Sequence, residues 1–160
     1  KIKNFKKDFG KIADYIIVDS AAGLGNEAKS AMELADELII VTNPELPAIT
    51  DALKTIKLAE QMKKNVIGVI ITRVCMNDVE MYPKSVKEML EVPILGMVPE
   101  DINIKKSQNM KDAVVHTHPK SKSAKAYKEI AAKMIGINYN HKKDKETLWK
   151  KLLRGIGMKS

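Results

Sequence analysis

Short apolar runs alternate along the chain with segments whose apolar residues recur at helical spacing. Uninterrupted apolar runs of this length are typical of strands buried on both faces of a parallel sheet. The predicted strands are Tyr15–Val18, Glu37–Thr42, Val66–Thr72 and Pro93–Val98. The predicted helices are about Glu27–Leu34, Ala48–Lys63, Pro83–Leu90 and Ser121–Ile135, with a short helix and a turn in Ile102–Val115. This alternation predicts an α/β fold, with a mostly parallel sheet flanked by helices in right-handed crossovers.

The first apolar run ends in a carboxylate that is followed by small residues. Asp19 comes directly after Val18, and Ser20 to Gly25 contains two alanines and two glycines. Open α/β sheets bind ligands at the carboxyl ends of their strands, and small residues let the backbone approach a ligand closely. A carboxylate beside such a loop suits a magnesium ion and a phosphate. A capped turn, in which Asp19 or Ser20 starts the next helix, explains the same residues equally well.

The three other predicted strands are each followed by polar, charged or proline residues. Residues 42–45 contain Thr, Asn, Pro and Glu, residues 72–73 are Thr and Arg, and residues 99–101 are Pro, Glu and Asp. Because parallel strands end at one rim of a sheet, we expect these loops to be neighbours of each other and of Asp19.

The amino-acid composition indicates which kinds of partner the protein favours and which kinds of site it excludes. The formal net charge of +8 over 160 residues favours anionic partners, although a lysine-rich proteome explains it as well. No apolar run is long enough to span a bilayer, and the chain does not open with a signal peptide. Cys75 is the only cysteine, which excludes an internal disulfide, and no Cys or carboxylate cluster accompanies the three histidines. The chain opens without Met in a polar stretch, so we expect it to be the carboxyl-terminal part of a longer protein.

The last segment of the chain, 145–160, has an amphipathic pattern. A polar linker, 137–144, precedes it, so the predicted divisions are 1–136, 137–144 and 145–160. On a helical wheel the bulky apolar residues share one arc and the basic residues lie opposite. The residues of the two faces are Leu148, Trp149, Leu152, Leu153 and Ile156, and Lys150, Lys151 and Arg154. Such a helix suits the interface of an anionic membrane, and a helix packed on its own domain is the alternative.

Taken together, the strand ends and their loops resemble the MinD branch of the MinD/ParA family, P-loop ATPases of the SIMIBI class with a deviant Walker A motif. The resemblance covers nearly the whole chain. The matching segments are Asp14–Gly25, Ala35–Glu45, Asp51–Lys54, Gly68–Val74 and Val92–Asp101.

The resemblance implies roles for individual residues. Asp19 matches the catalytic acidic residue that holds the magnesium-bound water, and Gly23 matches the glycine whose amide senses the γ-phosphate. Thr72 and Arg73 match the pair at the adenine end of the nucleotide. The loop that closes over the base matches Pro99, Glu100 and Asp101. Dimer and partner contacts in the family match Asn43, Glu45 and Asp51. Ala21 departs from a position that is often proline, which should make the loop less stiff.

A larger departure is that the Gly-Gly-Lys-rich Walker A loop and the switch I aspartate are absent from the sequence. Phosphates lose their main ligands without that loop, so we expect this fragment alone not to hydrolyse ATP. The parent protein is expected to use ATP, ADP and Mg²⁺ and to form an ATP-dependent homodimer.

The resemblance also implies a biological role for the parent protein. It would bind the inner face of the cell membrane from the cytoplasm through its terminal helix, bind a regulatory protein, and help to position cell division. The alternatives are a ParA-like partition protein, a flagellar-number ATPase, or a non-catalytic adaptor with the same fold. DNA is the less expected partner, because a partition protein has no need of a terminal helix that carries Trp149.

Overall fold

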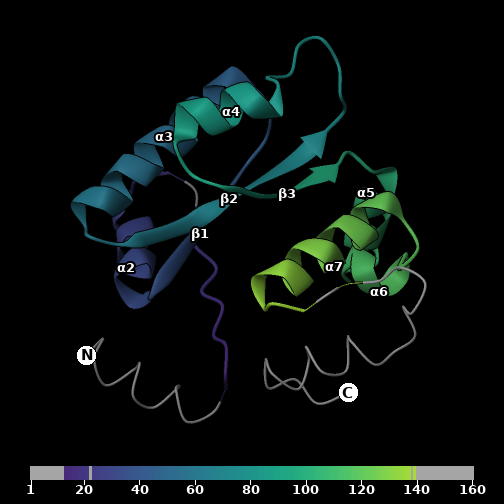
Figure 1. Cartoon of the computed structure of the whole chain (residues 1–160). Helices are drawn as coiled ribbons and strands as arrows, with labels where there is room; N and C mark the ends of the chain where they lie inside the picture. The colour runs from purple at the N-terminus through teal and green to yellow at the C-terminus, as the bar shows by residue number, and fades with distance from the viewer. Residues whose placement is uncertain (1–12, 22, 138, 140–160) are drawn as a thin grey trace. The chain divides into compact units, whose positions relative to one another are not determined.

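The computed structural model describes residues 13–21, 23–137 and 139. The chain divides into two units, Lys1–Asp36 with Asn140–Ser160, and Glu37–Tyr139, and each is described by itself. Figure 1 labels the elements along the chain. In order they are α2 (Asn26–Leu34), β1 (Glu37–Thr42), α3 (Leu46–Gln61), β2 (Asn65–Val74), α4 (Pro83–Leu90), β3 (Ile94–Pro99), α5 (Ile102–Asn109), α6 (Val114–Thr117) and α7 (Lys122–Met134).

The second unit is built on a three-stranded sheet in the order β1-β2-β3. Both strand pairs are parallel, with Thr42 opposite Ile71 in the first and Val74 opposite Pro99 in the second. Parallel strands need a crossover between them, and α3 and α4 supply the two crossovers. The predicted fold class, a parallel sheet flanked by helices, is therefore confirmed.

One predicted strand is wrong. Residues 15–18 have an irregular backbone, and no strand among the described residues pairs with them. Their four apolar side chains are between 37% and 78% exposed, so this run, predicted to be a buried strand, is not buried. A strand is stable only when neighbouring strands satisfy its backbone groups and other elements cover its side chains, and the described part of the chain supplies neither to this segment.

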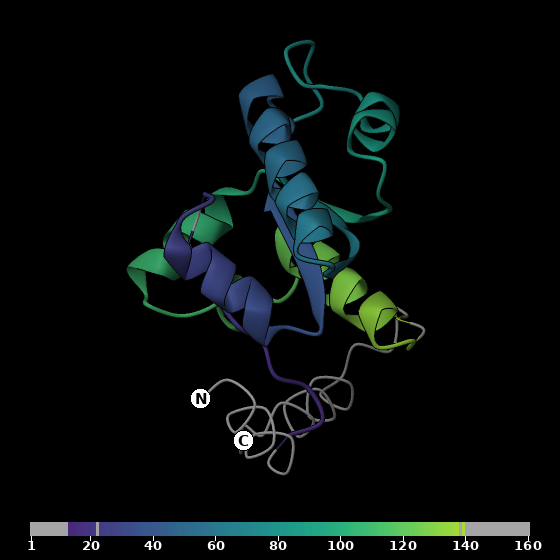
Figure 2. The same cartoon turned by 90° about the vertical axis from the view of Figure 1, so that its left-hand side faces the viewer.

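The core of the second unit lies between the sheet and the pair α3 and α4. Isoleucines along one face of α3 pack with valines and isoleucines of the strands and with the buried side of α4. Figure 2 shows α3 running along β1. The fully buried residues of this core include Ile49, Ile56, Val69, Ile71, Val86 and Leu90.

Helix α7 packs on β3, and a glycine makes the close approach possible. A Cβ atom added to Gly96 would lie 2.3 Å from Cγ1 of Ile130, so close that either β3 or the Ile130 side chain would have to move. Val98, two residues further along β3, is fully buried, as expected for the same face of the strand. The absence of a side chain at position 96 therefore sets how closely α7 lies on the sheet.

The expected short helix and turn in residues 102–115 form two helices, α5 and α6. Helix α3 begins at Leu46, two residues before the predicted start, with Pro47 in its first turn. In the first unit, α2 buries Ala28 and Met32. The predicted terminal helix, in residues 145–160, lies outside the described residues.

Candidate functional site: the carboxyl rim of the sheet

The carboxyl ends of β1, β2 and β3 meet at one rim of the sheet. The Thr72 hydroxyl donates a hydrogen bond to the carbonyl oxygen of Thr42 at 3.1 Å, which joins the ends of β2 and β1. The Glu100 amide donates to the carbonyl oxygen of Val74 at 3.0 Å, which joins the loop after β3 to the end of β2. Three of the four predicted loops are therefore brought together as expected.

Arg73 and Glu100 meet across this rim. Arg73 Nε lies 3.3 Å from Oε2 of Glu100, and the arginine side chain is 64% exposed. The backbone of Arg73 has a φ of +60°, a left-handed conformation that residues other than glycine seldom adopt. Arg73 lies where the register between β2 and β3 is irregular, between Ile71 and Val74, and its guanidinium stays at the surface beside a carboxylate.

Asp101, by contrast, turns its side chain into the protein. It is only 5% exposed, and its Oδ1 accepts a hydrogen bond from the Asn103 amide at 3.0 Å, which caps α5. Its Oδ2 accepts from the amide and the hydroxyl of Ser123, at 3.1 and 2.9 Å, in the first turn of α7. We call this arrangement the Asp101 clasp, because one carboxylate holds the first turns of two helices.

The hydrogen bonds of the clasp control the ionisation of Asp101. Burial alone would raise the pKa of the carboxyl group, because it disfavours the charged form. The bonds from the amides of Asn103 and Ser123 and from the Ser123 hydroxyl outweigh burial and lower the pKa from 3.8 to about 2. Asp101 is therefore charged at neutral pH. Its carboxylate oxygens are engaged within the protein, so any contact of this residue with a base would be through its backbone.

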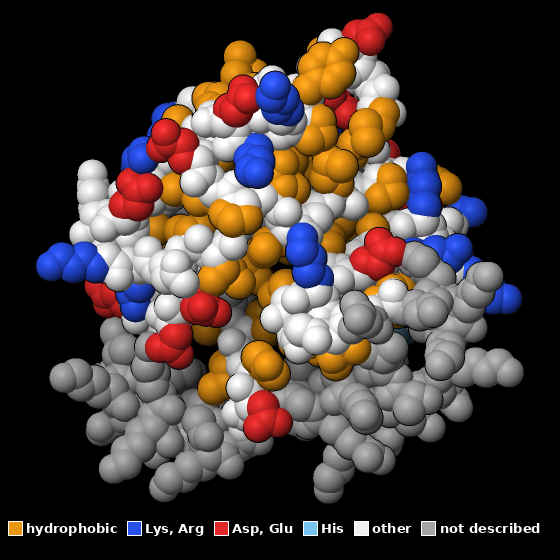
Figure 3. All heavy atoms as spheres, in the orientation of Figure 1, with side chains coloured by type: hydrophobic (Ala, Val, Ile, Leu, Met, Phe, Trp, Pro, Cys, Tyr) orange, Lys and Arg blue, Asp and Glu red, His pale blue; other side chains and the backbone are white. Residues whose placement is uncertain are grey.

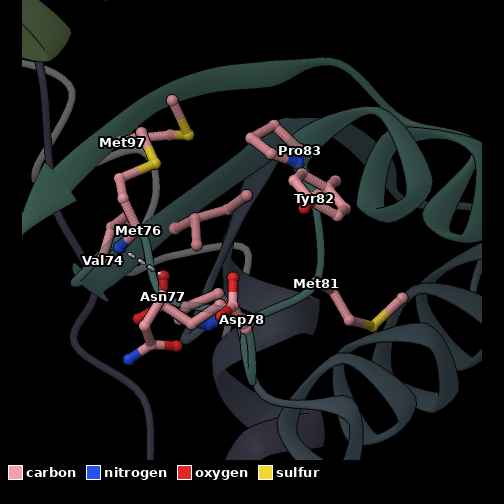
Figure 4. A pocket seen from close by; sticks show the side chains of 11 residues that line it. Val74, Met76, Asn77, Asp78, Met81, Tyr82, Pro83 and Met97 are labelled. Carbon is pink, nitrogen blue, oxygen red and sulfur yellow. Dashed lines mark hydrogen bonds between the residues drawn. The ribbon is translucent and has the colours of Figure 1, made fainter.

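A small cavity lies beside the rim and was not predicted from the sequence. It has a volume of about 130 Å³ and lies under the loop between β2 and α4 (Figure 4). Met76 and Met97 lie together on one side of it, and Tyr82 and Pro83 lie on the other. Ligand pockets for small molecules usually measure roughly 300–1,000 Å³. The cavity is too small for a nucleotide, and none of the predicted base-binding residues lines it.

The loop above this cavity is closed by a carboxylate. Glu80 accepts hydrogen bonds from the Cys75 amide at 2.7 Å and from the Met76 amide at 2.9 Å. The loop holds Val79 and Tyr82 outward, 88% and 75% exposed, and Figure 3 shows hydrophobic side chains gathered on this part of the surface. The sequence signal that could have found the loop is a glutamate among Asn, Asp and Met residues between a strand and a helix.

The predicted partner residues lie on the turn after β1 and at the start of α3. Glu45 and Asp51 are exposed, and Asp51 pairs with Lys54 at 2.9 Å. Asn43 is half-buried, and its side-chain oxygen accepts a weak hydrogen bond from the Glu45 amide at 3.4 Å. The carboxylates are available to a partner, while Asn43 shapes the turn.

Asp19 and Gly23 belong to the other unit, so their place relative to the rim stays a prediction. Asp19 is exposed, and Gly23 has a φ of +88°, which glycine adopts without strain. An accessible carboxylate beside a left-handed glycine fits a magnesium ion that is held through water and a phosphate. No group of three or more His, Cys, Asp or Glu side chains among the described residues could hold a metal by itself.

The predicted membrane residues, Leu148 to Ile156, lie outside the described residues. In the part of the chain that the structure describes, no helix combines the length and the apolar character needed to cross a bilayer.

The chain matches known proteins over most of its length. A ParA family model, described as an NUBPL iron-transfer P-loop NTPase, matches residues 2–135. An uncharacterized ATP-binding protein of Methanocaldococcus jannaschii is 37% identical over 158 residues, covering 98% of this chain and 60% of the relative. The septum site-determining protein MinD of Bacillus subtilis is 30% identical over 141 residues, covering 85% of this chain and 52% of the relative. The chain thus spans about half the length of the curated relatives that it matches.

Solved structures show the same likeness. The cell division ATPase MinD of Pyrococcus furiosus superposes with a TM-score of 0.78 at 30% identity, over 85% of this chain and 57% of that one. MinD of Pyrococcus horikoshii, solved with Mg-ADP, gives 0.77 at 30% identity over 84% and 55%. MinD in a MinC:MinD complex of Aquifex aeolicus gives 0.76 at 28% identity over 88% and 61%.

Proposed function

Because the chain belongs to the MinD/ParA family of P-loop NTPases, we propose that it is the part of an ATP-hydrolysing protein that carries the base-binding rim. The observation that carries the proposal is the rim itself, where three parallel strands end together and Arg73 meets Glu100. Open parallel sheets bind their ligands at this edge. The likeness to MinD structures, one of them solved with Mg-ADP, supports a nucleotide with Mg²⁺ as the ligand.

In this proposal the two parts of the nucleotide are recognised by different segments. The carboxylate of Asp19 acts at the phosphate end by holding a magnesium-bound water, and the amide of Gly23 donates to the terminal phosphate. ATP would supply the phosphoanhydride bond that is cleaved, and Mg²⁺ would polarise its phosphoryl oxygens. The base end is assigned to Thr72, Arg73, Pro99, Glu100 and the backbone of Asp101.

ATP binding is proposed to drive a homodimer that attaches to the inner face of the cell membrane. Each protomer would contribute one helix from 145–157, and the pair would bind far more firmly than a single helix because the second contact is intramolecular. Hydrolysis would release the dimer to the cytoplasm. The MinD relatives support cell division as the process, and the solved MinC:MinD complex supports a regulatory protein as a partner. We assign its contact to Glu45 and Asp51, which are exposed.

Asp19→Asn in the full-length protein tests the catalytic role. A residue that orients magnesium-bound water in phosphoryl transfer is worth several kcal/mol, so turnover of ATP should fall by about 100-fold or more. The matched control is Asp14→Asn, which makes the same change at another exposed aspartate of the same segment and should retain turnover. Circular dichroism would verify that both variants keep the fold.

Wild-type turnover in the Asp19→Asn variant would remove Asp19 from the site. Equal losses in both variants would show that the segment is needed for folding or assembly and not for chemistry at one carboxylate.

A further inference from the structure

The charges of the second unit are divided between two parts of its sequence. Residues 102–137 carry eight lysines, no arginine and two acidic residues, a formal charge of +6. Residues 37–101 carry seven basic and ten acidic residues, a formal charge of −3. One compact unit therefore has a positive side, formed by α5, α6 and α7, and a mildly negative side that holds the core.

Six exposed lysines define the positive side, and we call them the lysine surface. They are Lys105, Lys106, Lys111, Lys120, Lys122 and Lys125. Figure 3 shows basic side chains gathered at the edge formed by α5 and its neighbouring turns. The Asp101 clasp brings the lysines of two helices together, because it joins the first turn of α5 to the first turn of α7.

Carboxylates do not pair with the lysine surface. Among the described residues, no carboxylate forms an ion pair with any of its six lysines, whereas four of the seven basic residues of 37–101 are paired, namely Lys54, Lys57, Arg73 and Lys84. Asp112, one of the two acidic residues of 102–137, is engaged by His116 at 3.0 Å. The positive charge is thus left for a partner outside the described chain.

One lysine of the surface lies where a helix disfavours it. Lys122 is the first residue of α7, whose first turn contains no acidic residue. Helix N-termini carry partial positive charge, which the Asp101 carboxylate offsets through the clasp. An anionic partner would add a second negative group beside this end of α7.

Apolar side chains beside the lysines favour a membrane over a nucleic acid as the partner. Ile102 and Met110, at the two ends of α5, are 61% and 63% exposed. Apolar side chains framed by lysines suit the headgroup region of a bilayer, where the chains insert and the ammonium groups meet phosphates. Nucleic-acid surfaces favour arginine and stacking aromatic side chains, and residues 102–137 have no arginine and a single aromatic residue, Tyr127.

We infer that the lysine surface is a second membrane contact, which lays the domain against an anionic bilayer alongside the terminal helix. The inference rests on the proposed membrane attachment. The linker of residues 137–144 spans at most roughly 26 Å when extended, so a bilayer that holds the terminal helix lies within reach of α7. Binding through two contacts orients the domain, whereas a single contact would leave it free to rotate.

The first experiment measures binding of the full chain to vesicles rich in phosphatidylglycerol. In the test variant Lys105, Lys106, Lys122 and Lys125 are replaced by Gln. Each lysine near an anionic surface strengthens binding by about fivefold, so the variant should need at least about tenfold more lipid for half-maximal binding. The matched control replaces Lys54, Lys57, Lys63 and Lys84 by Gln, which removes the same charge from the other side and should bind nearly as the wild type does.

The second experiment asks which surface touches the lipid. Cys75 is first replaced by Ser, so that the dye reacts at one position only. An environment-sensitive dye is then attached to Met110→Cys or, as a control, to Val79→Cys, which is also an exposed apolar position. The emission of the dye at position 110 should shift to the blue with anionic vesicles and not with phosphatidylcholine vesicles. The dye at position 79 should not shift with either.

Leu152→Asp with Leu153→Asp separates this inference from the proposed membrane helix. If these changes abolish binding while the lysine variant binds like its control, the lysine surface is not a membrane contact and the helix is. If the leucine variant binds like the wild type while the lysine variant is weakened, the proposed helix fails and the lysine surface stands. A lysine variant that loses binding to a DNA duplex while keeping vesicle binding would overturn the inference in favour of a nucleic acid.

Discussion

Residues 37–101 and residues 102–137 belong to one compact unit, yet different forces hold them. The first part buries a continuous cluster of Ile, Val and Leu side chains between the strands, α3 and α4. The second part buries the hydroxyl groups of Ser107 and Ser123, at 1% and 0% exposure, beside a smaller apolar set that includes Ile130, and it is joined to the first part at the Asp101 carboxylate. The first is stabilised mainly by apolar area removed from water, and the second also depends on hydrogen bonds whose partners must all be present.

This difference shows how one compact unit can combine a part with a large apolar core, residues 37–101, and a part with a highly charged surface, residues 102–137. The apolar part tolerates paired charges on its exterior because its stability comes from its interior. The polar part tolerates six unpaired lysines among the described residues because the Asp101 clasp fixes the helices that bear them. Three changes test this comparison.

The largest effect is expected from Ile56→Ala, because Ile56 is 1% exposed at the centre of the apolar cluster. Removing a buried isoleucine side chain to Cβ leaves a cavity and should lower the free energy of unfolding by about 2–5 kcal/mol. The matched change is Ile102→Ala, at a position that is 61% exposed on α5. It should change stability by less than about 0.5 kcal/mol in urea unfolding. Similar losses at both positions would contradict the division into two kinds of packing.

An intermediate effect, with a pH dependence, is expected from Asp101→Asn. The amide keeps one acceptor and adds a donor that faces the donors of Asn103 and Ser123, so we expect a loss of about 1–3 kcal/mol at neutral pH. The pKa of Asp101 is lowered from 3.8 to about 2 in the folded protein. Its stabilising contribution is therefore complete above about pH 4 and is lost as the pH falls through about 2.

Urea unfolding of the wild type and of Asp101→Asn across this range would show the two free energies converging at low pH. Asp78→Asn, an exposed aspartate in the loop after β2, controls for the loss of one carboxylate. A constant gap between the wild type and Asp101→Asn from pH 7 to pH 2 would mean that the charged form of Asp101 contributes nothing.

The smallest effect on stability is expected at the rim, from the Arg73–Glu100 pair. The arginine is 64% exposed, and exposed ion pairs contribute about 0.2–1 kcal/mol. A double-mutant cycle of Arg73→Gln and Glu100→Gln should give a coupling energy in that range, which shrinks in high salt. A coupling well above it, unaffected by salt, would make the rim part of the rigid core and not a surface ready for a ligand.

Much of the fold could be predicted because it depends on local periodicity. The isoleucines of α3 recur at helical spacing, the runs of β1 and β2 are rich in β-branched residues, and β3 is a short apolar run that ends in Pro99, so these elements are visible in the sequence. The segment 15–18 has the same apolar pattern and is not a strand. The apolar pattern indicates which side chains tend to avoid water. It does not show whether a neighbouring strand is present to pair with the segment.

The candidate site could be predicted only in part, for a similar reason. The meeting of the loops at Arg73 and Glu100 follows from parallel strands. The Asp101 side chain is buried because it accepts hydrogen bonds from Ser123, which is 22 residues away in sequence. No local sequence pattern predicts a hydrogen bond over that separation. The cavity beside the rim depends on Pro44 and Met97 from separate strand ends and on a loop that Glu80 closes through backbone amides. Contacts of this kind arise only after the chain has folded.

The Asp101 clasp also has a consequence for how the native protein opens. The segment from Asp101 to Ser123 contains α5 and α6 and ends in the first turn of α7. The Asp101 carboxylate joins the two ends of this segment through its hydrogen bonds. A segment closed at its base opens as a cooperative unit when that closure breaks. The entropy gained by releasing a loop of this size rises only slowly with its length. The amides of α5 and α6 should therefore exchange with solvent through one shared opening event, while those of the sheet wait for global unfolding.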